Sequence, residues 1–212
     1  MRITKDKETR RAELIDASAA LFLEKGFDAT MVSDIVKRVG VAQGTFYYYY
    51  PAKEDVLDDV LKKLLEEGVA RAERLAQDET QTCAQRLEGL FRMLFSPRGS
   101  IEASSRYSQF LQDPSVRGRF EEVRFGILCP VFQSLLDAGV EAGEFRALRF
   151  GNELAEMALR GASALVHARQ ELMTQPMGAD ATMDALAELM EKLLGLPDQS
   201  LDFKDRIIRR HT

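Results

Sequence analysis

The sequence predicts an all-α protein in which a small N-terminal unit of three helices precedes a larger helical domain. Apolar residues recur at helical spacing in most segments, and Gly or Pro marks the breaks between them. A run of uncharged polar and aromatic residues, 43–50, follows one longer and one short helical segment. With 212 residues and 45% hydrophobic content, the chain is long enough to bury a sizeable core in one or two domains.

The first predicted helix ends at Gly26. Apolar residues between Leu14 and Phe22 recur at helical spacing. Lys25 followed by Gly26 is typical of a helix end, with a cation in the last turn and a left-handed cap residue after it. The pattern therefore places one amphipathic helix before the first glycine of the chain.

The second predicted helix ends at Gly40. We expect Thr30 to cap its start, because a hydroxyl oxygen accepts a hydrogen bond from a free backbone N–H. Met31, Ile35 and Val39 form a stripe at four-residue spacing that predicts one buried face. A turn of only two residues then leads to the third helix.

The third predicted helix, 43–49, has two different faces. Gln43 and Tyr47 lie four residues apart and share one face, whereas Phe46 and Tyr50 share another. Core packing explains Phe46 and Tyr50, but burying every tyrosine would require partners for four phenol hydroxyls within little more than one turn. We therefore expect the Gln43 face to be an exposed, uncharged surface that fits a DNA major groove.

These elements together predict a helix-turn-helix. Two short helices joined by a tight turn that contains a glycine, behind a longer first helix, define this motif. The third helix, 43–49, then occupies the position of the recognition helix.

The same segment resembles a known family. Five short motifs carry the resemblance: Gly26-Phe27-Asp28-Ala29-Thr30-Met31, Ile35-Val36, Val39-Gly40-Val41, Gly44-Thr45-Phe46-Tyr47 and Tyr50-Pro51-Ala52-Lys53-Glu54. They are similar to the signature of TetR-family transcriptional regulators, over about 50 contiguous residues. The resemblance implies a DNA-binding domain at 1–53, a ligand-binding and dimerisation domain at 54–212, and a ligand-responsive regulator, most often a repressor, that binds a palindromic operator as a dimer.

The resemblance also implies which residues contact DNA. Gln43 and Tyr47 are placed against base edges and the thymine methyl group, and Gln suits adenine because it forms two hydrogen bonds with that base. Phosphate contacts fall on three hydroxyl groups and one cation, with Gly44 in the same surface. The phosphate-contacting residues implied in this way are Thr45, Tyr48, Tyr49 and Lys53.

Three positions depart from the family pattern. Ala42 and Ala52 stand where the family usually has a Ser, Thr or Asn cap, and Tyr48 stands where histidine is common. Loss of a cap costs about 0.5–2 kcal/mol of helix stability. We therefore expect a recognition helix that is loosely formed until DNA orders it.

The charge distribution requires a local basic face. Residues 1–53 carry nine Lys or Arg and seven Asp or Glu, whereas the rest of the chain carries 20 and 27, and the net charge is −5. A protein that is acidic overall binds DNA through a local cluster of cations rather than by bulk attraction. The candidate cations are Arg2, Lys5, Lys7, Arg10, Arg11, Lys37 and Lys53. The 5–11 cluster also contains two carboxylates, so a DNA-contacting arm and a plain solvated helix start both stay open.

The remaining chain predicts helices throughout. A long fourth helix, 53–76, leaves the DNA-binding unit. Further helices are expected at 87–95, 101–111, 116–140 with Pro130 inside it, 150–171 and 181–195, and the tail 201–212 either forms a short helix or frays.

Aromatic residues gather in the middle helices. Taken alone, each is more typical of a core residue than of a ligand contact, although the interiors of helical bundles also hold ligand pockets. The resemblance implies a pocket enclosed by these helices, and the composition favours a largely apolar effector. The candidate ligand-binding residues are Phe91, Phe95, Tyr107, Phe110 and Phe125.

The last two long helices predict a homodimer. Small residues cluster on 150–171, and an apolar stripe follows 181–195. The small residues are Ala158, Gly161, Ala162, Ala164 and Ala168, and the stripe is Met183, Leu186, Ala187, Met190, Leu193 and Leu194. The resemblance implies that this pair of helices packs against its two-fold mate as a four-helix bundle.

The sequence does not contain the motifs that characterise other classes of protein. The two histidines, His167 and His211, stand outside any metal-binding, phosphate-binding or dinucleotide-binding motif, so we expect no enzyme, no metal and no cofactor. Cys83 and Cys129 are far apart and predict free thiols.

We expect a soluble cytoplasmic protein, because the longest apolar run, 125–136, contains Pro130 and is shorter than a membrane span. A helical adaptor is the alternative, but it gives no reason for the 40–53 segment.

Overall fold

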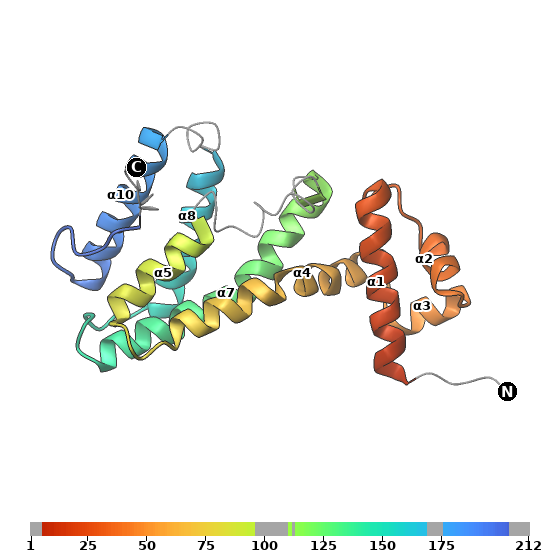
Figure 1. Cartoon of the computed structure of the whole chain (residues 1–212), viewed down its shortest axis with the longest axis horizontal. Helices are drawn as coiled ribbons and strands as arrows, with labels where there is room; N and C mark the ends of the chain where they lie inside the picture. Colours follow the sequence, from red (N-terminus) through yellow and green to blue (C-terminus); the bar gives the residue numbers. More distant parts are fainter. Residues whose placement is uncertain (1–5, 96–109, 112, 169–175, 204–212) are drawn as a thin grey trace, which may run out of the picture. The chain divides into compact units, whose positions relative to one another are not determined.

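The computed structural model describes residues 6–95, 110–111, 113–168 and 176–203. These residues form helices with turns and irregular connections, and no β-strand lies among them, so the predicted all-α fold is confirmed. The chain divides into two compact units, which we describe separately (Figure 1). The described parts of Met1–Glu66 and Ser104–Arg124 form the first unit, and those of Glu67–Ala103 and Phe125–Thr212 form the second.

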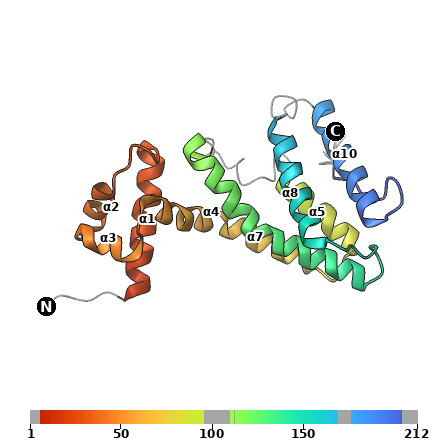
Figure 2. The same cartoon turned by 180° about the vertical axis from the view of Figure 1, so that it is seen from behind.

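The first unit contains the predicted helix-turn-helix. Its helices are α1 (Lys7–Lys25), α2 (Val32–Val39), α3 (Gln43–Tyr49), the first part of α4 (Lys53–Ala76) and the first part of α7 (Pro114–Glu141). Figures 1 and 2 both show α2 and α3 beside α1. The bounds of α3 and α4 are those that the sequence predicted. The core consists of side chains that are at most 1% exposed, among them Leu14, Phe22, Ile35, Phe46, Val56, Leu57 and Leu61.

Gly40 makes the turn between α2 and α3 possible. Its φ of 75° and ψ of 38° lie in the left-handed region, where a side chain is disfavoured. In this conformation the N–H groups of Gly40 and Val41 both donate to the carbonyl of Val36, at 2.9 and 3.0 Å. The predicted end of α2 at this glycine is confirmed.

The loop between α1 and α2 differs from the prediction. Thr30 does not cap α2; it is 1% exposed, and its hydroxyl donates to the carbonyl of Gly26 at 2.7 Å. Met31 takes the cap position, where its N–H donates to the Asp34 carboxylate at 3.0 Å, and its side chain is 67% exposed rather than part of a buried stripe. Gly26 has a positive φ of 86° but an extended ψ of 161°, so it is not the left-handed cap that we expected.

The second unit is a helical bundle. It contains the remainder of α4, α5 (Cys83–Phe95), the later part of α7 (Pro114–Glu141), α8 (Gly151–Ala168) and α10 (Pro176–Leu194). Its core includes Leu87, Leu90, Phe91, Phe132, Leu135, Leu159, Ala162, Leu194 and Phe203. Glu144 accepts the N–H groups of Cys83 and Ala84, at 3.0 and 3.2 Å, and so satisfies the free donors at the start of α5. The two cysteines are free thiols, as predicted.

Helix α7 is the one helix in the described part of the chain that is long and apolar enough to cross a membrane by length and composition. Its apolar side chains are used in packing: Phe120 is 1% exposed in the first unit, and Phe132 and Leu135 are equally buried in the second. Burial inside the protein accounts for these apolar residues of the helix. Pro130 lies within α7, as the sequence predicted.

Three predicted segments differ from the structure or lie partly outside the described residues. Of the helix expected at 101–111, the structure describes Phe110 and Leu111, which are helical, and the rest lies outside the described residues. Helix α10 begins at Pro176, earlier than expected, at a position where proline is well tolerated because the first helical N–H needs no partner. Residues 201–203 are irregular rather than helical.

Candidate nucleic-acid interface

The recognition helix α3 is anchored by two aromatic side chains. Phe46 is fully buried and Tyr50 is 3% exposed, and their ring centres lie 5.8 Å apart. Ala42 precedes the helix without a side-chain cap hydrogen bond, as the sequence indicated. A helix of seven residues with no cap has little stability of its own, so packing of these two rings holds it in place.

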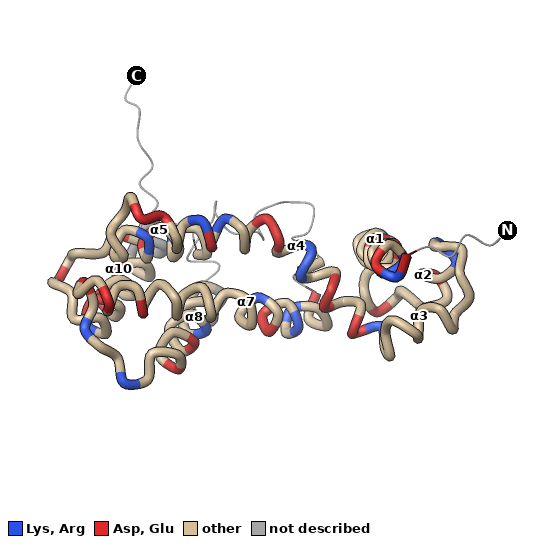
Figure 3. Tube along the Cα trace, turned by 90° about the horizontal axis from the view of Figure 1, so that it is seen from below, with Lys and Arg blue, Asp and Glu red and all other residues tan. Residues whose placement is uncertain are grey.

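The opposite face of α3 is exposed and uncharged. Tyr47 is 50% and Tyr48 70% exposed, Gln43 and Gly44 are exposed, and Thr45 and Tyr49 are half-buried. Figure 3 shows no charged residue on α3. The structure therefore gathers the six DNA-binding candidates of this helix on one short element, with the base-reading and phosphate-binding candidates side by side.

The basic residues of α1 lie in different environments. The Lys7 ammonium lies 5.6 Å from the centre of the Tyr48 ring, which brings one cation next to the exposed face of α3. Arg10 and Arg11 instead bind Glu13 and Asp59, each at 2.6 Å. Arg2 and Lys5 lie outside the described residues.

Three side chains tie α1 and the end of α3 to α4. The Tyr50 hydroxyl donates to the Asp59 carboxylate at 2.7 Å, and the Arg11 guanidinium donates to the same carboxylate at 2.6 Å and to the Tyr50 oxygen at 3.2 Å. The buried phenol is thereby satisfied within the protein. Sequence reasoning placed Tyr50 inside but did not identify Arg11 and Asp59 as its partners.

This network keeps the Tyr50 phenol protonated and the Asp59 carboxylate ionised. Burial raises the pKa of Tyr50 to about 12, and the hydrogen bond to Asp59 adds to that effect. Burial also acts to raise the pKa of Asp59, but hydrogen bonds from Tyr50 and Arg11 outweigh it, so this pKa lies below its ordinary value. The stabilisation from Asp59 is therefore present at neutral pH and is lost as the pH falls through its lowered folded-state pKa.

In the structure the Lys53 side chain is bound within the DNA-binding unit. Its ammonium donates to the backbone carbonyls of Phe27, Thr30 and Asp28, at 2.7, 3.1 and 3.4 Å. It also lies 4.2 Å from the centre of the Phe27 ring. An ammonium has three N–H donors. All three have acceptors in the loop between α1 and α2, so Lys53 fastens that loop to the start of α4.

The predicted ligand-binding residues are distributed over both units. Phe91, Phe95 and Phe125 lie in the core of the second unit. Phe110 belongs to the first unit, where its ring stacks on Phe22 with centres 6.2 Å apart. Tyr107 lies outside the described residues. Phe110 is thus assigned to the first unit, and the remaining three are packed in the core of the second.

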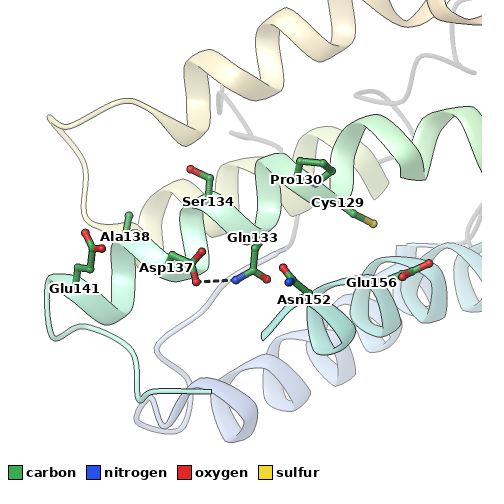
Figure 4. Close-up of a pocket in the computed structure, with 9 residues that line it drawn as sticks. All are labelled: Cys129, Pro130, Gln133, Ser134, Asp137, Ala138, Glu141, Asn152 and Glu156. Carbon is green, nitrogen blue, oxygen red and sulfur yellow. Dashed lines mark hydrogen bonds between the residues drawn. The ribbon is translucent and has the colours of Figure 1, made fainter. Parts of the chain in front are cut away.

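A groove lies between α7 and α8. It has a volume of about 670 Å³, and Figure 4 shows the nine side chains around it. Its lining residues are Cys129, Pro130, Gln133, Ser134, Asp137, Ala138, Glu141, Asn152 and Glu156. The Gln133 amide donates to Asp137 at 2.6 Å, and burial raises the pKa of the Cys129 thiol. None of the predicted ligand-binding residues lines this groove.

The fold and the site define a class of protein. A helix-turn-helix whose second short helix presents an exposed uncharged face belongs to a DNA-binding transcriptional regulator. Residues 14–60 match the family model described as bacterial regulatory proteins, tetR family.

Relatives extend this similarity beyond the DNA-binding unit. The chain is 30% identical over 152 residues to the transcriptional repressor KstR2 of Mycobacterium tuberculosis, covering 68% of this chain and 74% of that protein. It is also 30% identical over 171 residues to KstR2 of Rhodococcus jostii, covering 74% and 81%. The chain belongs to the TetR family and is a ligand-responsive DNA-binding transcriptional regulator.

Solved structures share the fold. FadR from Bacillus subtilis, solved in complex with stearoyl-CoA, is 25% identical with a TM-score of 0.50, and the match covers 90% of this chain and 99% of that one. RolR, solved with resorcinol, is 24% identical with a TM-score of 0.62 and 90% coverage of both chains. The second comparison shows the fold alone.

The environment of Lys53 generates a prediction. Lys53→Ala leaves three backbone carbonyls without their donor, so we expect the free energy of unfolding to fall by about 1–3 kcal/mol. The slope of log affinity against log salt on a duplex selected from a random pool should stay unchanged, since no phosphate contact is lost. Urea denaturation and fluorescence anisotropy at several salt concentrations measure the two quantities.

Lys7→Ala serves as the matched control. Lys7 is exposed beside Tyr48, so its loss should leave stability nearly unchanged and reduce the salt slope by about 0.9, the value for one phosphate contact. A Lys53→Ala protein of normal stability with a reduced slope would restore the phosphate role of Lys53.

Proposed function

We propose that the protein represses transcription by binding a palindromic operator as a two-fold dimer, with α3 of each protomer in the major groove. The observation that carries the proposal is the two-sided α3, with Phe46 and Tyr50 buried and an uncharged face exposed. A recognition helix requires this combination, because it must be held rigidly from behind and remain open in front. The function requires no catalytic group, and it places the protein with the chromosome in the cytoplasm.

In this proposal Gln43 and Tyr47 read bases. Gln43 begins α3 and is exposed, so its amide can form two hydrogen bonds with an adenine edge. The Tyr47 ring, half exposed and one turn further along the same face, contacts a thymine methyl group. Phosphates are bound by the hydroxyl groups of Thr45, Tyr48 and Tyr49, while Gly44 lets the backbone approach DNA closely. Lys7 and the exposed Lys37 supply the positive charge.

Base reading by these two residues makes a specific prediction. Gln43→Ala and Tyr47→Ala should each reduce the preference for the operator over random duplex by about 1–3 kcal/mol, because each removes a base contact. Competition binding with operator and random duplexes at fixed salt measures this preference. Tyr47→Phe is the control: it keeps the ring that contacts the methyl group and should retain the preference. A uniform loss on all duplexes would show that these residues do not read bases.

The dimer would form through the exposed faces of α8 and α10, which both views show side by side (Figures 1 and 2). The predicted stripe on α10 is mostly buried within the protomer, and its buried members include Met183, Leu186 and Met190. The faces left exposed carry small and apolar residues at helical spacing. They are Met157, Gly161, Ala164 and Ala168 on α8, and Ala181, Ala185 and Leu189 on α10. Met157 is 69% and Leu189 55% exposed, which favours a partner on this surface.

Gly161 provides a test of the dimer. A side chain at this position meets no atom within 4 Å in the protomer, so Gly161→Glu should fold normally but place a charge in the proposed interface. We expect a monomer in sedimentation at micromolar concentration, and equal affinity for one and two half-sites. Gly118→Glu introduces the same residue at another open helical glycine, outside this face, and should remain a dimer. A dimeric Gly161→Glu protein would place the interface elsewhere.

We further propose that the effector carries a long apolar chain and that a CoA thioester of a long-chain fatty acid is the class to test first. The aromatic core of the second unit supports an apolar ligand, and the FadR structure was solved with stearoyl-CoA. Release from the operator follows when the effector favours a dimer in which the two α3 helices no longer match successive major grooves.

We expect the affinity for stearoyl-CoA and the affinity for operator DNA to depend on each other. If stearoyl-CoA weakens operator binding by a factor of about 10 to 100, operator DNA must weaken stearoyl-CoA binding by the same factor. Isothermal titration of stearoyl-CoA with and without operator measures this factor. Equal affinity in both titrations would contradict the effector proposal while leaving DNA binding intact.

A further inference from the structure

A segment that follows α10 packs into the core of the second unit. Residues 199–203, which we call the C-terminal strap, follow α10 and have no helical structure. The Phe203 side chain is 1% exposed and its ring stacks on Phe91, with centres 4.3 Å apart and planes at 5°. Leu201 is 6% exposed. An irregular segment therefore supplies one of the most deeply buried aromatic rings of the unit.

Two carboxylates hold the strap by its backbone. Glu191 of α10 accepts the N–H groups of Gln199 and Leu201, at 3.0 and 2.8 Å, one on each oxygen. Glu88 of α5 accepts the N–H of Asp202 at 2.8 Å. Glu191 is 3% exposed, so its charge is removed from water and relies on these donors. The strap is attached by discrete hydrogen bonds rather than by a continuous helix.

The strap also contains a strained residue. Gln199 has a φ of 61° and is the single residue other than glycine with a positive φ in the described part of the chain. This conformation disfavours residues with a Cβ atom and persists where surrounding contacts enforce it. Here the enforcing contact is the bond from the Gln199 N–H to Glu191. The docked strap therefore stores strain at the point where it turns into the core.

The ring that Phe203 covers is one of the predicted ligand-binding residues. Phe95 and Phe132 occupy other sides of Phe91, with ring centres 5.5 and 5.4 Å away, and both belong to helices. Moving either ring out of the core would disturb a helix. Moving Phe203 requires the loss of three backbone hydrogen bonds and relieves the strain at Gln199. Phe203 is therefore the ring beside Phe91 that can leave the core without disturbing a helix.

We propose that the C-terminal strap covers an apolar ligand site beside Phe91, and that an acyl chain binds there by displacing Phe203. This inference rests on the proposed function in one respect, namely that the effector carries a long apolar chain. The walls of the site are Phe91, Phe95 and Phe132, and docking of the strap competes with the effector. The strength of the docked strap then sets the effector concentration at which the regulator responds.

Hydrogen exchange of the full-length protein tests the displacement directly. Ligand binding normally slows amide exchange near a site, but the strap should behave in the opposite way. We expect saturating stearoyl-CoA to speed exchange of the Leu201 and Asp202 amides at least tenfold, while amides of α5 around Phe91 become slower. Unchanged or slower exchange of the strap with ligand bound would overturn the inference.

Two strap variants should shift ligand affinity in opposite directions. Phe203→Ala removes the competing ring and should tighten stearoyl-CoA binding about tenfold, which corresponds to 1.4 kcal/mol. Gln199→Gly removes the backbone strain, stabilises the docked strap and should weaken binding several-fold. Phe132→Ala is the control, since it removes another ring beside Phe91 but leaves the strap attached. It should leave strap exchange unchanged in the absence of ligand, whereas Phe203→Ala should speed it.

The outcomes separate this inference from the proposed function. If stearoyl-CoA binds and releases operator without exposing the strap, the inference fails and the proposed function stands. If it exposes the strap without changing operator affinity, the inference stands and the proposed ligand response fails. Binding to Phe203→Ala but not to the parent protein would support the strap as a complete block. Binding to neither protein, or equal shifts for Phe203→Ala and Gln199→Gly, would overturn it.

Discussion

The anchoring of α3 is the constraint on which the DNA-binding unit depends. A seven-residue helix without a side-chain cap cannot maintain its shape in water, because too few hydrogen bonds offset the cost of nucleation. Phe46 supplies the buried ring, and Tyr50 adds a ring whose hydroxyl is held by Asp59 and Arg11. The outer face of α3 is thereby freed from any structural task. Gln43, Tyr47 and Tyr48 can remain exposed without weakening the fold.

Helix α4 is the common attachment for this arrangement. Asp59 holds Tyr50 and Arg11, and Lys53 holds the carbonyls of the α1–α2 loop. Both residues lie near the start of one uninterrupted helix that continues to Ala76, in the second unit. A movement of α4 along its axis therefore acts on the end of α3 and on the α1–α2 loop together. In the proposed function, this attachment would link ligand binding to DNA release without a change in the proposed base-reading residues.

The sequence predicted the parts of the structure that local patterns determine. The bounds of α3 and α4, the burial of Phe46 and Tyr50, and the left-handed turn at Gly40 follow from spacing and glycine placement. Long-range side-chain contacts were not predictable in this way. Lys53 reaches back more than 20 residues to the α1–α2 loop, and no local pattern distinguishes such a contact from one with phosphate.

The same limit applies to the last helices. The apolar stripe of α10 correctly indicated burial, but periodicity does not say whether the partner is the same chain or a second copy. In the structure Met183 and Met190 are buried within the protomer, which leaves the smaller Ala181 and Ala185 facing outward.

The aromatic residues of the second unit present a related problem, because core and ligand site make the same demands on composition. An apolar site that stood empty would be costly, by about 24 cal/mol for each Å³ of unfilled volume. A regulator that waits for an apolar effector must therefore fill that space with its own side chains. Helical residues such as Phe132 fill it permanently, since they cannot leave without disturbing a helix. Phe203, at the end of a strained irregular segment held by the carboxylates of Glu191 and Glu88, is suited to filling it temporarily. On this argument a packed core around Phe91 is what the ligand-free form of such a protein should show.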